Sequence, residues 1–179
     1  MKDATRWKVI SLALAAFLVG MLVTTAIAGG GGTTKLSGGT NSKVALARGS
    51  AAFATTSDSW TNLTGASVSI RIPAGQRAIL LATFSGESLC NGGFVGDECD
   101  VRVLFNGSQG QPGPAAPNSG AAFDSEGSGD DYREMHSMQR SKGPFGPGLY
   151  TVRVQVETCC GTTFTLDDWH LTVQSFRVG

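Results

Sequence analysis

The sequence predicts an all-β protein: a single antiparallel β-sandwich, jelly-roll-like, with roughly eight strands, preceded by an N-terminal signal helix. Three observations predict this class. Glycine is abundant, at 25 of 179 residues, and Val, Thr and Phe recur beside it. Several segments alternate apolar and polar residues with the period of two that is typical of half-buried strands. Residues 29–179 show no helical periodicity, and short strands joined by tight turns account for this composition.

The N-terminus has the order of a secretory signal. Lys2, Arg6 and Lys8 form a basic start, and Val9 to Ala28 then carries no charge. The segment ends on the small residues Ala26-Ile27-Ala28, which suit a signal peptidase site. A signal anchor is the alternative, because 20 uncharged residues are long enough to cross a bilayer. Both interpretations place the remainder outside the cytoplasm, secreted or at the cell surface.

Three segments follow from this division: a signal peptide or anchor at 1–28, a flexible Gly/Thr/Ser linker at 29–42, and a β-sandwich domain at 43–179. The 151 residues after position 28 are enough for one domain with a core. Residues 1–28 hold three basic residues and one acidic residue, so 11 basic and 13 acidic residues remain, a net charge near −2. Nucleic-acid binding requires clustered Lys and Arg, and the sequence has no such cluster, so we expect no nucleic-acid partner.

The first half of the domain contains two clear strand patterns. Ala66 to Ile72 alternates apolar and polar residues, and Pro73-Ala74-Gly75 follows as a turn. Ala78 to Glu87 begins apolar at consecutive positions. This pattern predicts a central strand that is covered on both faces.

The second half continues the alternation. Residues 101–105 alternate and end at the turn signal Asn106-Gly107, and residues 150–157 give the cleanest strand pattern of the chain. Residues 107–131 are irregular and are interpreted as a loop, although they contain three collagen-like triplets. Residues 133–141 are predicted to form a strand.

The last strand is predicted to contain a β-bulge. Phe164 and Leu166 share one parity, whereas Trp169 and Leu171 share the other. A regular strand would place the two pairs on opposite faces. One extra residue at Asp167-Asp168 brings them to the same face. We also expect this long strand to lie inside a sheet and not at its edge.

The four cysteines predict a disulfide. Cys90 and Cys99 flank a short loop between two predicted strands, and in an exported protein this spacing favours a bond between them. Cys159 and Cys160 are adjacent, and they either pair with each other or each reach the first group. A zinc site of all four thiolates is the alternative, but no C-x2-C pair is present and an oxidising compartment favours disulfides.

Acidic residues gather in the irregular region, where they offer oxygen ligands to calcium or form a solvated loop. The weak calcium candidates are Asp124, Glu126, Asp130 and Asp131. A second cluster consists of Asp97, Glu98 and Asp100. Neither cluster fits the EF-hand loop pattern, so we expect a solvated loop, no bound metal and no cofactor.

The sequence contains few residues of the types that could form a catalytic site. His136 and His170 are the only histidines; Ser137 follows the first, and Asp167 and Asp168 precede the second. A Ser/His/Asp set can be assembled from these residues, but no G-x-S-x-G motif supports it. We therefore expect no enzymatic activity.

Aromatic side chains support carbohydrate binding as an alternative, because sandwich domains of exported proteins present such rings to sugars. Aromatic residues available for this role are Trp60, Tyr132, Phe145, Tyr150 and Trp169. The two tryptophans also fit the core of a domain of this size. The candidate ligand-binding residues are Trp60, Trp169, His170, Asp167 and Asp168.

The chain resembles a group of uncharacterised secreted bacterial β-sandwich proteins over most of residues 58–178. The segments that carry the resemblance are WTNL (60–63), PAG (73–75), FSGESLC (84–90), HSMQRS (136–141), GLYTVRVQ (148–155) and LDDWHLTV (166–173). The resemblance implies the fold class and export, and it implies no activity. A looser likeness to C1q-like and tumour-necrosis-factor-like jelly rolls suggests trimers by analogy.

The sequence thus predicts an exported, non-enzymatic binding or structural module of the cell surface or extracellular space, with a carbohydrate-binding module as the alternative. The expected partners are a glycan or surface polymer. Assembly of this chain with copies of itself into a homo-oligomer is a further alternative. Membrane contact is expected only through residues 9–28, and only if they are not removed.

Overall fold

The computed structural model describes residues 34–38, 43–113, 119–127 and 132–178. Every regular element in these residues is a strand, and none of them belongs to a helix long and apolar enough to span a membrane. The predicted signal segment at 1–28 lies outside the described residues, and all the strands belong to one compact unit, Gly31–Gly179.

The described residues form eleven strands. Their bounds are β1 Thr34–Gly38, β2 Val44–Gly49, β3 Phe53–Thr55, β4 Thr61–Ile72, β5 Arg77–Asn91, β6 Glu98–Phe105, β7 Ser108–Gln109, β8 Ala121–Ser125, β9 Glu134–Phe145, β10 Gly148–Thr158 and β11 Thr163–Val178.

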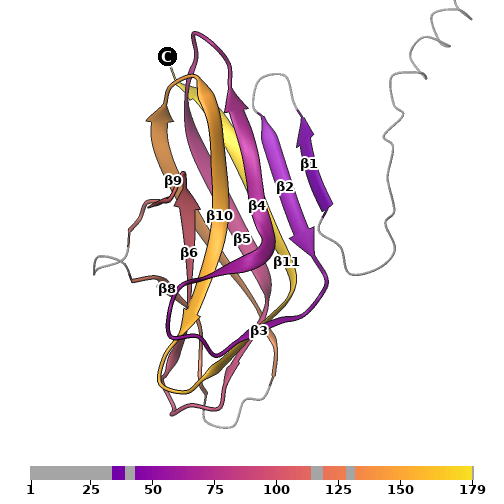
Figure 1. Ribbon diagram of the computed structural model, residues 1–179, viewed down its shortest axis with the longest axis vertical. Helices are drawn as coiled ribbons and strands as arrows, with labels where there is room; N and C mark the ends of the chain where they lie inside the picture. Colours follow the sequence, from indigo (N-terminus) through magenta and orange to yellow (C-terminus); the bar gives the residue numbers. More distant parts are fainter. Residues whose placement is uncertain (1–33, 39–42, 114–118, 128–131, 179) are drawn as a thin grey trace, which may run out of the picture. The chain divides into compact units, whose positions relative to one another are not determined.

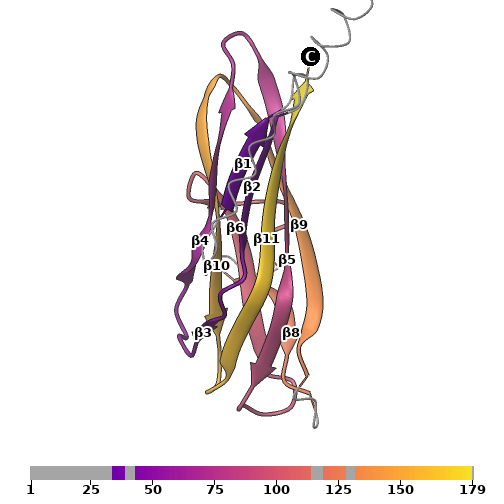
Figure 2. The same ribbon diagram turned by 90° about the vertical axis from the view of Figure 1, so that its right-hand side faces the viewer.

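These strands form two antiparallel sheets that face each other (Figures 1 and 2). Sheet A has the order β1-β2-β11-β5-β9, with β3 also paired to β11. Sheet B has the order β4-β10-β6-β7, with β8 also paired to β6. Buried side chains from the inner faces of both sheets make one hydrophobic core. The predicted antiparallel β-sandwich is confirmed.

Eight of the strands have the connectivity of a jelly roll. Here β2, β4, β5, β6, β8, β9, β10 and β11 are numbered 1 to 8 in chain order. Sheet A then has the strand order 1-8-3-6, and sheet B has the order 2-7-4-5. This is the arrangement of two interleaved Greek keys. The short strands β1, β3 and β7 are additions at the ends of this framework, which explains why the sequence pattern suggests eight strands and the structure has eleven.

Strand β1 differs from the prediction, because it lies within residues 29–42, which were expected to be a linker throughout. Thr34–Gly38 pairs antiparallel with Val44–Gly49 of β2. An edge strand offers unpaired backbone groups, and a neighbouring segment can pair with them whatever its side chains are. Apolar periodicity therefore could not reveal this strand. Residues 29–33 and 39–42 of the predicted linker lie outside the described residues.

The predicted bulge in β11 is confirmed. Asp167 pairs with Glu87 and His170 pairs with Ser85, so Asp168 and Trp169 together oppose the single residue Gly86. Asp168 has a φ of 41°, in the left-handed region that one class of β-bulge uses. As predicted, β11 also lies inside its sheet, between β5 and β2.

The bulge directs Trp169 into the core. Its side chain is 2% exposed, and it lies between two glycines on neighbouring strands. A Cβ at Gly49 would lie 2.6 Å from Cζ2 of the indole, and a Cβ at Gly86 would lie 3.0 Å from the Cβ of Trp169. The indole thus occupies the space that a side chain at Gly49 would fill, and the absence of a side chain at Gly86 lets the backbone of Trp169 approach β5 closely.

The expectation that Ala78–Glu87 is covered on both faces is wrong. The residues of β5 that face inward, such as Leu80 and Phe84, are fully buried, whereas Ile79 is 37% exposed. Ile79 pairs with Phe176 of β11, which is 45% exposed. Among the described residues, no layer covers the apolar side chains on the outer face of sheet A. The consecutive apolar residues in β5 therefore alternate between the core and this outer face.

We predict that Gly49→Ala destabilises the fold by about 1–3 kcal/mol, because the new methyl group overpacks the Trp169 ring. Urea unfolding followed by tryptophan fluorescence measures this change.

Gly146→Ala is the matched control, because a Cβ at Gly146 meets no atom within 4 Å. It should change the free energy of unfolding by less than about 0.5 kcal/mol. Equal stabilities of the two variants would contradict the role of Gly49.

Candidate functional site

One end of the sandwich is cross-linked by the predicted disulfide. Cys90 near the end of β5 is bonded to Cys99 in β6, with their Cα atoms 5.8 Å apart. Because β5 belongs to sheet A and β6 to sheet B, the bond joins the two layers. Both cysteines are buried. The loop between them is therefore held at a fixed position across the end of the sandwich.

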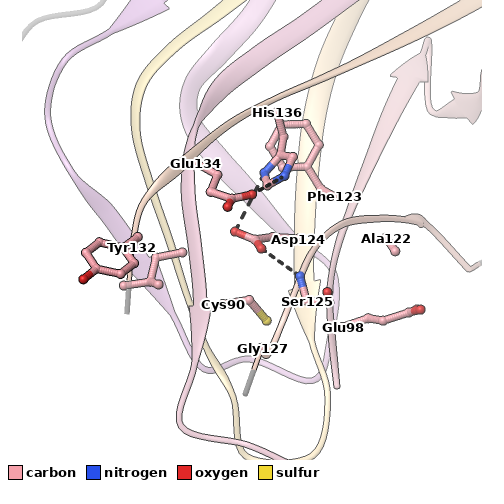
Figure 3. A pocket seen from close by; sticks show the side chains of 11 residues that line it. Cys90, Glu98, Ala122, Phe123, Asp124, Ser125, Gly127, Tyr132, Glu134 and His136 are labelled. Carbon is pink, nitrogen blue, oxygen red and sulfur yellow. Dashed lines mark hydrogen bonds and ion pairs between the residues drawn. The ribbon is translucent and has the colours of Figure 1, made fainter. Parts of the chain in front are cut away.

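A cleft of about 350 Å³ opens beside this disulfide (Figure 3). Leu89 and Cys90 of β5 contribute to its wall, together with Glu98 of β6. The other wall consists of Ala122 to Ser125 in β8, with Glu134 and His136 from β9. The cleft thus lies where an outer strand of sheet A, β9, approaches an outer strand of sheet B, β8.

Phe123 forms the base of the cleft. Its side chain is buried and contacts Phe84, with ring centroids 5.4 Å apart, and Phe164, at 6.4 Å. The imidazole of His136 meets the Phe123 ring edge to face, with centroids 5.7 Å apart and an interplanar angle of 70°. This aromatic cluster extends from the core to the cleft and fixes one side of the His136 ring.

Polar contacts fix the other side of His136. Its Nδ1 lies 2.8 Å from the hydroxyl oxygen of Ser88 in a hydrogen bond. A carboxylate oxygen of Glu134 lies 3.5 Å from Nε2, and one of Asp124 lies 3.9 Å from Nδ1. Asp124 also accepts a hydrogen bond of 2.8 Å from the backbone N–H of Ser125. Figure 3 shows His136, Glu134 and Asp124 around one opening.

The cleft has a negative charge and one exposed aromatic ring. Glu98, Asp124 and Glu134 contribute three carboxylates, and none of the described residues that line it is Lys or Arg. Tyr132 lies at the rim and is 76% exposed. The cleft therefore offers hydrogen-bond acceptors, an imidazole and a ring face to a ligand.

The two tryptophans chosen from the sequence lie outside this cleft. Trp169 is buried in the core, so the prediction that it contacts a ligand is wrong. Trp60 is half-buried, and the guanidinium of Arg102 covers its ring at 4.0 Å from the centroid. Arg102 in turn donates a hydrogen bond to Gln155. Trp60 thus belongs to a packed cluster on the outer side of sheet B.

Two carboxylates beside Trp60 are partly desolvated. Burial raises the pKa of Asp100, and the neighbouring charge of Glu98 raises it further. Burial also raises the pKa of Glu157, with Asp100 contributing in the same direction and Arg102 opposing it. One oxygen of Asp100 is buried without a hydrogen-bond partner. These side chains form a polar layer over sheet B and do not open into the cleft.

The other candidates near the bulge have structural contacts. Asp167 accepts a hydrogen bond of 2.7 Å from Arg133 and one of 2.9 Å from the backbone N–H of Asp168. Asp168 and His170 are exposed on the outer face of sheet A. Ser137 donates its hydroxyl to the backbone oxygen of Phe84. The suggested Ser/His/Asp set is therefore dispersed over separate contacts.

The predicted acidic loop is only partly described. Asp124 lines the cleft, and Glu126 follows it in the chain with one carboxylate oxygen buried and without a partner. Asp130 and Asp131 lie outside the described residues. Among the described residues, the carboxylates of Asp124 and Glu126 belong to no group of three metal-ligating side chains within 4.8 Å of one another.

A second polar cluster lies beyond the disulfide. Cys159 and Cys160 are free thiols in the turn between β10 and β11, and their sulfur atoms lie within 4.8 Å of each other and of a carboxylate oxygen of Asp97. Hydrogen bonding to Cys159 raises the pKa of Cys160 to about 11, with smaller contributions from desolvation and the charge of Asp97.

Compared with known proteins, the chain matches no family model and no curated sequence.

The sequence contains a local signal for the cleft in the parity of its lining residues. Tyr132, Glu134 and His136 share one parity, which on a strand places them on one face. Ser88 and Cys90 share a parity on β5. The pairing of Ser88 with Glu134 and of Gly86 with His136 brings the two sets together. Only that register, which links residues far apart in the chain, reveals the site.

We predict that Cys159 and Cys160 are alkylated by iodoacetamide without prior reduction, whereas Cys90 and Cys99 are not. Because the thiolate is the reactive form, labelling of Cys160 should be slow at neutral pH and should accelerate as the pH rises towards about 11. Peptide mass spectrometry at several pH values measures both effects.

The Cys159→Ala variant is the control for the pKa, since it removes the side-chain hydrogen bond that is the largest cause of the shift. In this variant Cys160 should react at lower pH. Identical pH profiles for the two proteins would contradict the assigned cause.

Proposed function

We propose that this protein is an extracytoplasmic, non-enzymatic binding module, and that the cleft beside Phe123 holds a short segment of a glycan. The observation that carries the proposal is the combination of an exposed tyrosine with three carboxylates and an imidazole around one opening. The glycan segment is neutral or carries amino groups.

The side chains suit the two kinds of surface that a sugar presents. The ring of Tyr132 is available to the apolar C–H face of a pyranose ring, because 76% of the residue is exposed. Carboxylate oxygens of Asp124 and Glu134 accept hydrogen bonds from hydroxyl groups, and each carboxylate has several acceptor positions. The volume of about 350 Å³ lies at the lower end of the range for small-molecule sites.

Charge determines which glycans fit. Three carboxylates line the cleft without a Lys or Arg among its described residues, so an anionic sugar is repelled. A protonated amino group within about 4 Å of one carboxylate gains about 1–4 kcal/mol, depending on how far solvent screens the pair. An amino sugar should therefore bind more tightly than its neutral counterpart.

The surroundings of His136 support binding without catalysis. Its hydrogen-bonded neighbour Ser88 is fully buried, so the hydroxyl oxygen is not accessible to a substrate. A serine nucleophile must reach the carbon it attacks. His136 instead has the contacts of a ring held in one orientation, as a ligand-binding imidazole requires.

The extracytoplasmic location is supported by the disulfide, since such bonds persist mainly in oxidising compartments. The resemblance to secreted bacterial β-sandwich proteins belongs to the same proposal.

Calorimetric titration of the full-length chain with three oligosaccharides tests the function: a chitosan oligomer, a cello-oligosaccharide and an oligogalacturonate. We expect the chitosan oligomer to bind about tenfold or more tightly than the neutral sugar, which corresponds to about 1.4 kcal/mol, and the anionic sugar not to bind. Tyr132→Ala and Asp124→Asn should each weaken binding.

Matched controls separate these effects from general surface changes. Phe176→Ala removes an exposed aromatic ring on the outer face of sheet A, and Asp168→Asn removes an exposed carboxylate at the bulge. Both should bind like the unchanged protein. Binding that is insensitive to Tyr132→Ala and Asp124→Asn would contradict the assignment of the cleft, and cleavage of the oligosaccharide would contradict a non-enzymatic role.

A further inference from the structure

We infer that Cys159, Cys160 and Asp97 form a binding site for a thiophilic divalent cation of the zinc class. The two sulfur atoms and a carboxylate oxygen of Asp97 all lie within 4.8 Å of one another. Among the described residues, this is the one group of three metal-ligating side chains with such spacing. The site is distinct from the glycan cleft and does not depend on it.

The turn between β10 and β11 holds both thiols in place. Cys160 and Gly161 have φ values of 62° and 90°, and positive φ at both central residues is the pattern of a type I′ hairpin turn. The backbone N–H of Thr162 donates to the carbonyl oxygen of Cys159 at 2.9 Å, and the Thr162 hydroxyl donates to the same oxygen at 2.8 Å. Thr162 is fully buried, so it anchors the turn to the interior of the sandwich.

Asp97 reaches the thiols from a different part of the chain. It lies in the loop that the Cys90–Cys99 disulfide closes. The backbone N–H of Phe94 donates to one of its carboxylate oxygens at 2.7 Å, and the backbone N–H of Asp97 donates to the carbonyl oxygen of Phe94 at 2.9 Å. A carboxylate oriented by a backbone N–H is a common arrangement for metal ligands.

Two further contacts keep this loop against the turn. Gly93 has no room for a side chain, because a Cβ there would collide with the methyl group of Thr162 and with the carboxylate of Asp97. The sulfur atom of Cys99 lies 3.9 Å from the Thr162 hydroxyl. The loop that carries Asp97 and the turn that carries the thiols thus meet at Thr162, close to the disulfide. In Figure 1 both segments lie at the lower end of the sandwich.

The spacing requires only a small contraction to bind metal. Two thiolates bound to one tetrahedral zinc ion at about 2.3 Å are separated by about 3.8 Å. The observed upper limit of 4.8 Å is about 1 Å longer, which side-chain rotation on a fixed turn can remove. No Lys, Arg or His of the described residues forms an ion pair with Asp97. Its charge is therefore available to a cation.

The ligand set determines which cation fits. Two thiolates select soft or borderline ions such as Zn²⁺ over Ca²⁺ and Mg²⁺, which prefer oxygen ligands. Three protein ligands leave the fourth tetrahedral position to water, because Cys160 is exposed. Such an open position is typical of sites that exchange their metal or bind a further ligand.

Titration of the full-length chain with Co²⁺ tests the site, because cobalt substitutes for zinc and its thiolate complexes absorb in the near ultraviolet. The chain is purified without reductant, and its free thiols are counted first. We expect one Co²⁺ per chain, a thiolate charge-transfer band, and displacement of cobalt by Zn²⁺ but not by Ca²⁺ or Mg²⁺.

Three variants assign the ligands. Cys159→Ser and Cys160→Ser should each reduce the charge-transfer band by about half and weaken binding, and Asp97→Asn should weaken it by about 10- to 100-fold. Asp168→Asn is the matched control and should bind like the unchanged protein. The proposal is overturned if Cys159 and Cys160 are oxidised to each other in the purified protein, if free thiols bind no cobalt, or if Asp97→Asn binds unchanged.

Discussion

The covalent bond between Cys90 and Cys99 is the constraint on which the rest of this structure depends. It connects a central strand of sheet A to a strand of sheet B by a covalent bond between their side chains. Closing a loop of this length stabilises the folded state by about 2–3 kcal/mol in the chain-entropy description. More importantly, it fixes the distance between the sheets at the end where the binding groups lie.

Both proposed sites are attached to this cross-link. Cys90 lines the cleft, and Glu98, which precedes Cys99, contributes a carboxylate to it. On the other side, the closed loop carries Asp97 towards the thiols of the β10–β11 turn. The backbone of the loop also pairs with the segment after β8, through the N–H of Gly96 to Glu126 and the N–H of Glu126 to Asp97. A shift of the loop would therefore move the walls of both sites together.

The sequence was sufficient for features that depend on local pattern. The parity change between Leu166 and Trp169 located the bulge, and the spacing of Cys90 and Cys99 located the disulfide. Strand β1 was not predicted, because backbone pairing at a sheet edge needs no apolar pattern in the sequence. The cleft was not predicted, because it forms only through the register between β5 and β9. The thiol cluster was not predicted either, because Asp97 and Cys160 are 63 positions apart in the chain. Such contacts follow from topology, which single-sequence periodicity does not determine.

Hydrogen–deuterium exchange on the Cys90→Ala/Cys99→Ala double variant tests the central role of the disulfide most directly. We expect faster amide exchange than in the unchanged protein at residues 94–99, 121–127 and 159–164, because these segments surround the cross-link. The turn at Pro73–Gln76, at the opposite end of β5, should exchange at its original rate. Equal acceleration at both ends, or none around the cleft and the thiol turn, would contradict the account.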